Sequence, residues 1–176
     1  MSDESDITFT VPGDPKGKAR PKFRRFGKFT MAYTPKATVE YEDKVRKSFK
    51  DSVDKDFKPL EGPIEAEAIC VFSIPSSVSK KKRQSMIGQP VLKKPDTDNI
   101  IKSILDPLNG VAYGDDSQVC KLSGLKIYGE VPRVDVTIRE YRNTIQPIYF
   151  IPPWSEDYEY YTNLFKEEEN TTNGAY

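Results

Sequence analysis

The sequence predicts an α+β fold of mixed α/β character, in which two main helices cover one face of a small mixed sheet. Short runs in which apolar and polar residues alternate indicate strands with one buried face. Two longer segments carry apolar residues at helical spacing. The order of these segments is strand, helix, strand, helix, strand, strand, which favours helices packed on a sheet. The 176 residues are typical of one main domain.

The first predicted strand covers residues 7–11 (ITFTV) and ends at the turn residues PGDP. Residues 16–35 are basic and aromatic and contain glycines, so we expect an extended loop or an irregular hairpin there. Thr34 and Pro35 then mark the start of a helix. This helix should run to about residue 53, with its core-facing positions at Val39, the Lys44 stem, Val45 and Phe49.

A second strand is predicted over residues 64–74 (IEAEAICVFSI), followed by a long lysine-rich loop over residues 75–95. The next helix begins at Thr97 or Asp98 and ends at Asn109-Gly110. Residues 118–128 and 133–140 are interpreted as a hairpin that turns at GEVP. We therefore divide the chain into a main domain, residues 1–142, and an acidic, aromatic and partly disordered tail, residues 143–176.

Several features indicate a cytoplasmic protein. The acidic N-terminus lacks the plan of a signal peptide, and no apolar run approaches the ~20 residues of a membrane span. Cys70 and Cys120 lie in apolar, strand-like runs and are expected to be free, buried thiols, although a disulfide between them stays possible. The chain has no histidine, which excludes Ser-His-Asp and Cys-His catalysis and an ordinary zinc site.

Basic residues are concentrated in two clusters, although the formal net charge is zero. Such clusters attract nucleic acid phosphates. The alternative interpretation is that both clusters are solvated loops that bind no ligand. Phenylalanines within the first cluster suit stacking on unpaired bases. The candidate DNA-binding residues are Lys16, Lys18, Arg20, Lys22, Arg24, Arg25 and Lys28 in the first cluster, and Lys80, Lys81, Lys82, Arg83, Lys93 and Lys94 in the second.

Acidic residues gather around the second helix, in the stretch KPDTDNIIKSILDPLNGVAYGDDSQV that starts at Lys94. One interpretation is a helix with acids at its N-terminus and an ion pair between Asp98 and Lys102, four residues apart. In the other interpretation, chain reversal returns Asp115 and Asp116 to the helix start. Carboxylates gathered there would repel one another unless a divalent cation joined them. Oxygen ligands favour Mg²⁺, with Mn²⁺ as a substitute.

A metal site between basic clusters is typical of phosphodiester hydrolysis, in which a cation activates water and holds the phosphate. Lys102 would then neutralise charge that develops in the transition state, or orient the attacking water.

Three motifs, KPDTDNIIKSILDPLNG, YGDDSQV and KIYGEVPRVDVTI, resemble those of the RusA-type Holliday junction resolvases, which are mostly phage and prophage endonucleases. The likeness covers roughly residues 7–140. It implies a RusA-like, homodimeric, Mg²⁺-dependent endonuclease that nicks four-way DNA junctions symmetrically in recombination and repair, in a bacterial or phage-infected cell, without a small-molecule cofactor. The implied catalytic residues are Asp96, Asp98, Lys102 and Asp116, and the implied metal ligands are Asp96, Asp98 and Asp116, with Asp115 a weaker candidate.

A dimer is also favoured by symmetry, because two opposed cuts need two sites and the chain has one acid cluster. Two alternatives stay open. The protein could bind junctions without cutting them, with the acids holding a structural cation. It could also be a PD-(D/E)xK nuclease, since Pro95 and Asp96 begin that motif, but no acid after residue 98 has a lysine two positions later.

Overall fold

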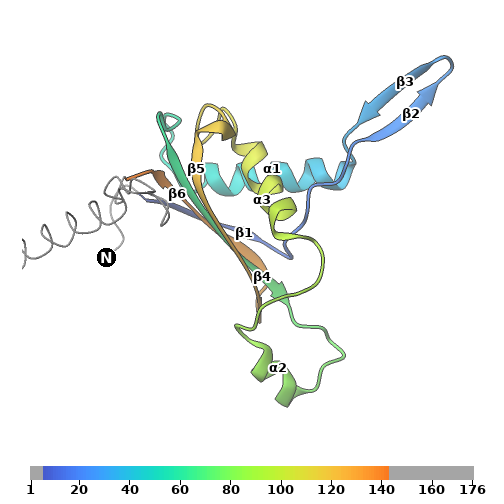
Figure 1. Cartoon of the computed structure of the whole chain (residues 1–176), viewed down its shortest axis with the longest axis vertical. Helices are drawn as coiled ribbons and strands as arrows, with labels where there is room; N and C mark the ends of the chain where they lie inside the picture. Colours follow the sequence, from blue (N-terminus) through green and yellow to red (C-terminus); the bar gives the residue numbers. More distant parts are fainter. Residues whose placement is uncertain (1–5, 143–176) are drawn as a thin grey trace, which may run out of the picture. The chain divides into compact units, whose positions relative to one another are not determined.

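The computed structural model describes residues 6–142, so the predicted tail, residues 143–176, lies outside the described residues. The strands are β1 (Ile7–Pro12), β2 (Lys22–Phe26), β3 (Phe29–Tyr33), β4 (Ile64–Ser73), β5 (Val119–Gly129) and β6 (Arg133–Glu140). The helices are α1 (Lys36–Lys50), α2 (Lys80–Met86) and α3 (Thr97–Leu105), with short 3₁₀ turns η1 (Asp106–Leu108) and η2 (Asp116–Gln118). Figure 1 shows their arrangement.

The main sheet has the strand order β1-β6-β4-β5 and is mixed, because β4 is parallel to β5 but antiparallel to β6. The predicted hairpin of the last two strands is therefore wrong: β4 lies between them, and residues 130–132 cross from one side of β4 to the other. The reason lies in burial. Most side chains of β4 are buried or half-buried, as in a central strand, whereas residues 120–125 of β5 are exposed, as at a sheet edge.

One face of this sheet carries the core, and α1 and α3 both pack on it (Figure 1). The predicted α+β class, with two main helices on one face, is thereby confirmed. The sequence-based assignment of the α1 face was wrong at Val39, which is 41% exposed, and at Lys44, which is also exposed and donates to the Pro12 carbonyl. The buried α1 residues Tyr41, Val45 and Phe49 are instead spaced four residues apart, so they form one stripe along the helix. Buried residues from the strands and helices form one cluster, which includes Phe9, Val11, Tyr41, Val45, Phe49, Ala68, Cys70, Ile100, Ile104, Val136 and Ile138.

A glycine lets α3 approach β5 closely. A Cβ atom on Gly124 would lie 2.6 Å from Cδ1 of Ile101 and 2.8 Å from Cγ2 of Thr97, closer than side-chain atoms approach one another. Gly124 therefore sets how closely the first turns of α3 approach the sheet. This placement matters because the same turns carry Asp98 and Lys102.

The predicted hairpin in residues 16–35 is present as β2 and β3, which extend away from the main sheet (Figure 1). Gly27 and Lys28 form a two-residue turn, and Gly27 has φ +57°, a conformation that favours glycine. All ten side chains of the two strands are exposed. We refer to β2, β3 and their turn as the basic arm.

The long loop of residues 75–95 contains the short helix α2, which the sequence did not predict. The chain then returns along the outer edge of β5, where the Val91 amide donates to the Lys126 carbonyl at 3.0 Å. Both cysteines are free, but only Cys70 is buried; Cys120 is exposed because it lies on the edge strand, so its predicted burial was wrong. Within residues 6–142, no helix is long and apolar enough to cross a membrane.

Candidate active site

The start of α3 presents two carboxylates to solvent. Asp96 occupies the N-cap position and Asp98 lies in the first turn, and both are exposed. The Asp96 side chain makes no capping hydrogen bond. Neither carboxylate forms an ion pair with any residue in the described part of the chain. Helix capping therefore does not account for this pair of acids.

Lys102 follows one turn after Asp98 and is also exposed. The ion pair expected from their spacing is not formed, and within residues 6–142 Lys102 has no carboxylate partner. Asp106, the next acid on this side of the helix, pairs with Lys18 instead. Within the described part of the chain, α3 and its N-cap thus carry one unpaired ammonium group and two unpaired carboxylates.

Lys18 has a structural role that the charge pattern did not predict. Its Nζ atom pairs with Asp106 and lies 3.1 Å from Oε1 of Glu42, so it links α1 to the end of α3. Burial lowers the pKa of Lys18, but hydrogen bonds to Asp106 and Glu42 outweigh this effect and raise the pKa above its ordinary value. Among the proposed DNA-binding cations, Lys18 is therefore the one already committed to protein carboxylates.

The second pair of acids begins η2. Asp115 accepts hydrogen bonds from the Ser117 side chain and from the Ser117 amide, the latter at 2.9 Å, and these contacts hold the pKa of Asp115 below its ordinary value. Gln118 fixes the turn by accepting from the Asp115 amide and donating to the Gly62 carbonyl at 2.9 Å. Asp116 is exposed, and its side chain has no partner in the described residues. Asp116 is thus the freer carboxylate of the two.

Tyr113 connects this turn to the end of α3. It is fully buried, and its hydroxyl donates to the Leu105 carbonyl at 2.9 Å. Burial raises the pKa of Tyr113 far above its ordinary value, and the negative charges of Asp116, Asp106 and Asp115 raise it further. Asp115 and Asp116 consequently lie near the residues that end α3.

The predicted convergence of all four acids at the helix start is not present as a ready cluster. In residues 6–142, no group of three or more Asp, Glu, Cys or His side chains lies close enough to hold a metal ion. The donor chemistry nevertheless suits Mg²⁺ or Mn²⁺, because every candidate ligand is a carboxylate and three of the four have no side-chain partner among these residues.

Lys126 holds the chain on both sides of Lys94. From β5, its half-buried side chain donates to the Lys93 and Pro95 carbonyls, each at 2.8 Å. These bonds fix the backbone that leads directly into Asp96. Sequence reasoning missed this role, because a lysine in an alternating strand gives no sign of which loop it will contact.

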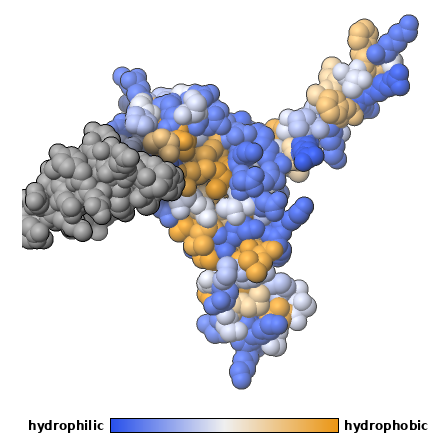
Figure 2. All heavy atoms as spheres, viewed as in Figure 1, coloured by the Kyte–Doolittle hydropathy of each residue, from blue (hydrophilic) through white to orange (hydrophobic). Residues whose placement is uncertain are grey.

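The basic arm carries most of the first cationic cluster. Lys22, Arg24 and Phe26 share one face with their partners on β3, and Arg24 lies over the Phe26 ring at 5.0 Å. Phe23 is 73% exposed and Phe29 80% exposed. Figure 2 shows hydrophobic and hydrophilic residues side by side along this arm. Such a surface can contact phosphates and stack on bases.

The second cluster is divided between free and engaged cations. Lys80, Lys81 and Lys82 are exposed on α2, whereas Arg83 donates to the Ile74 and Pro75 carbonyls. Lys93 lies over the rings of Phe72 and Tyr128, at 5.9 and 5.6 Å. Among the predicted DNA-binding residues of this cluster, Lys80–Lys82 and Lys94 are therefore the most available to phosphates.

Comparison with known proteins supports the resemblance in the motifs. Residues 12–139 match the family model of the endodeoxyribonuclease RusA. The chain is also similar to the uncharacterized protein YqaN of Bacillus subtilis strain 168, with 37% identity over 139 residues, covering 76% of this chain and 96% of YqaN. The match to the family model spans both pairs of acids, Lys102 and both basic clusters. The chain therefore belongs to the RusA family of Holliday junction resolvases, which are endodeoxyribonucleases that act on DNA junctions.

Proposed function

We propose that the protein is a Mg²⁺-dependent, structure-selective endodeoxyribonuclease that resolves four-way DNA junctions by paired, symmetric nicks. The observation that carries this proposal is the set of exposed charges on and beside α3 within the RusA match: Asp96, Asp98, Asp116 and Lys102 have no ionic partner in the described residues. Unpaired charges of both signs contribute little to stability, but they suit a site that binds a cation and a phosphate.

The proposed metal ligands are Asp96, Asp98 and Asp116. Asp115 is a weaker candidate, because its carboxylate already accepts the Ser117 amide. When bound, Mg²⁺ would lower the pKa of a water molecule and stabilise the departing oxygen. Lys102 contributes a fixed positive charge beside the reacting phosphate. Lys80–Lys82 and the basic arm hold the flanking phosphates without reading sequence.

The proposed active form is a homodimer, because two opposed cuts require two sites related by a two-fold axis. The edge of β5 is a candidate surface for this contact. Residues 88–91 cover only its second half, through bonds such as that from the Tyr128 amide to the Gln89 carbonyl. Before Lys126, Leu122 and Leu125 are each 49% exposed beside edge backbone that has no strand partner among the described residues. We place the enzyme in the cytoplasm of a bacterial or phage-infected cell, acting in recombination and repair.

Nicking of a synthetic four-way junction tests this function directly. The purified full chain is incubated with the junction in Mg²⁺, in Mn²⁺ and in EDTA, with linear duplex of the same sequence as the control. We expect paired nicks at symmetric positions in either metal and none in EDTA. Tight junction binding without nicks in any of these conditions would instead support the alternative, a junction-binding module with a structural cation.

Lys126 provides a further test, because it contacts the acid-bearing loop without being a proposed ligand. Lys126→Met should slow junction cleavage roughly 10- to 100-fold, the range typical of groups that orient metal ligands. The same substitution should destabilise the fold by only about 1–2 kcal/mol, since water can replace its hydrogen bonds. The measurement pairs cleavage rates over a range of Mg²⁺ concentrations with thermal unfolding. A cleavage rate equal to that of the wild type would show that the loop keeps its position without Lys126.

A further inference from the structure

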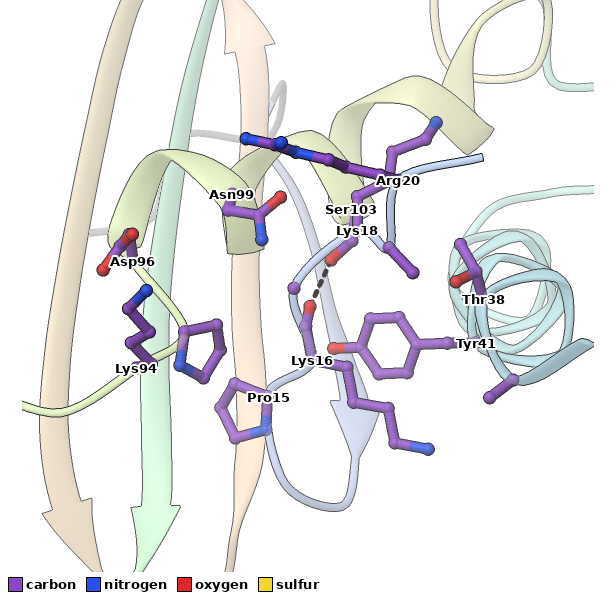
Figure 3. A pocket seen from close by; sticks show the side chains of 14 residues that line it. Pro15, Lys16, Lys18, Arg20, Thr38, Tyr41, Lys94, Asp96, Asn99 and Ser103 are labelled. Carbon is purple, nitrogen blue, oxygen red and sulfur yellow. Dashed lines mark hydrogen bonds between the residues drawn. The ribbon is translucent and has the colours of Figure 1, made fainter. Parts of the chain in front are cut away.

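A cavity of about 820 Å³ lies next to the candidate acids, between the segment that leads into the basic arm, the first turns of α1 and the start of α3. Figure 3 shows Asp96 and Lys94 on one side of the cavity, Thr38 and Tyr41 on the other, and Asn99 between them. The cavity is thus large enough for a nucleotide-sized ligand. Asp96, a proposed metal ligand, forms part of its lining.

The cavity is held open by contacts within the protein. The Lys18 amide donates to the Asn99 carbonyl at 3.1 Å, and the Ser103 hydroxyl donates to the Lys16 carbonyl at 2.6 Å. Gly17 completes this contact, since a Cβ atom there would lie 2.5 Å from Nδ2 of Asn99. Residues 16–18 are therefore fixed on α3. Any residue larger than glycine at position 17 would displace the Asn99 side chain.

The lining combines apolar surface, one side-chain amide and exposed cations. Pro15, Ala37, Pro95 and the Tyr41 ring provide apolar walls, and the Asn99 amide offers both a donor and an acceptor. Exposed cations stand at the margin: Lys16, Arg20 and Lys94. Lys18 also lines the cavity, but its charge is engaged by Asp106 and Glu42. An apolar slot with one amide and a cationic rim matches a nucleotide, whose flat base carries hydrogen-bonding edges and whose phosphates are anionic.

We propose that this cavity takes the base of one unpaired nucleotide next to the phosphate that is cut, and that Asn99 reads the edge of that base. The proposal rests on the proposed function and deepens it by naming a subsite. A base must leave its stack to enter the cavity, and this costs least where pairing is already disrupted, as at a junction centre. The requirement for an extruded base would favour branched DNA over intact duplex and would give cleavage a base preference.

The test fills the cavity from an exposed position. Ala37 lines the cavity on α1, and the Ala37→Phe side chain would occupy the space of the base; Val39→Phe, on the same helix but outside the cavity lining, is the matched control. We expect Ala37→Phe to slow cleavage of an intact four-way junction roughly tenfold or more, the size expected when one stacked base is lost. Val39→Phe should cleave at the wild-type rate, and both variants should melt at the wild-type temperature.

Abasic nucleotides decide whether the lost ligand is a base. They are placed one at a time on either side of the mapped cut, in junctions offered to the wild type and to Ala37→Phe. At one position the abasic junction should be cut equally fast by both proteins, because no base then needs the cavity. If no abasic position restores Ala37→Phe, or if this variant cuts intact junctions at the wild-type rate, the subsite is refuted and the cavity is only a groove beside the backbone.

Asn99→Ala provides the specificity readout. With the four bases placed in turn at the rescued position, the wild type should show a preference that Asn99→Ala loses, as expected when an amide that reads a base edge is removed. An unchanged preference would overturn the assignment of Asn99. A wild-type protein that cuts no junction in Mg²⁺ or Mn²⁺ would instead refute the proposed function, so the two failures are distinguishable.

Discussion

Asp98→Asn is expected to reduce junction cleavage to between roughly one hundredth and one thousandth of the wild-type rate, since losing a single group that stabilises a transition state often costs ~10²–10³ in rate. Asp98 is a proposed metal ligand in the first turn of α3, and asparagine keeps its size while removing its charge. Junction affinity should be equal to or greater than that of the wild type, because a negative charge beside the DNA phosphates is lost. Single-turnover cleavage in Mg²⁺ and gel-shift binding in EDTA measure the two effects separately.

The structure makes this prediction specific to function. Asp98 is exposed and has no side-chain partner among residues 6–142, so its replacement should leave the melting temperature within experimental error. Asp56→Asn removes the same charge from an exposed loop and is the matched control. If Asp98→Asn loses binding and melting temperature together with cleavage, the residue supports the fold and is not a ligand.

Local features of the fold were readable from the sequence, whereas strand adjacency was not. The helix at Lys36–Lys50 and the strand at Ile64–Ser73 follow from periodicity, which depends on near neighbours in the chain. The neighbours of β4 depend on contacts between distant residues, and a three-residue link after β5 suggested the wrong hairpin. Exposure along β5, which identifies it as an edge, is visible only once the sheet is assembled.

The sequence likewise predicted only part of the candidate site. The sequence pattern places Asp96 and Asp98 at the start of one helix and Lys102 one turn later on it, and the structure agrees. Spacing alone did not show that Asp106 pairs with Lys18, which leaves Lys102 without a carboxylate partner among residues 6–142. It also did not reveal the Gly17–Asn99 contact that shapes the cavity, because glycine gives no sign in sequence of what its missing side chain makes room for.

Lys102→Ala is expected to slow junction cleavage by about 10²–10³-fold while changing junction affinity little. Lys102 has no structural role that would account for it, because it is exposed on α3 and has no carboxylate partner in the described residues. An ion pair with Asp98 or Asp106 would give Lys102 a role in stabilising the helix, but Asp106 pairs with Lys18, and Asp98 has no ionic partner in residues 6–142. Its positive charge is therefore free to stabilise charge that develops on the phosphate during cleavage.

Rates at saturating junction concentration separate this role from simple phosphate binding, because a binding lysine would weaken affinity and leave the maximal rate unchanged. Lys58→Ala, which removes an exposed positive charge from the loop after α1, is the matched control and should alter neither quantity. Lys102→Arg keeps the charge on a different geometry, so a partial recovery of the rate indicates that charge is the main contribution. A maximal rate for Lys102→Ala equal to that of the wild type would remove Lys102 from the mechanism and leave the carboxylates as the only catalytic groups on α3.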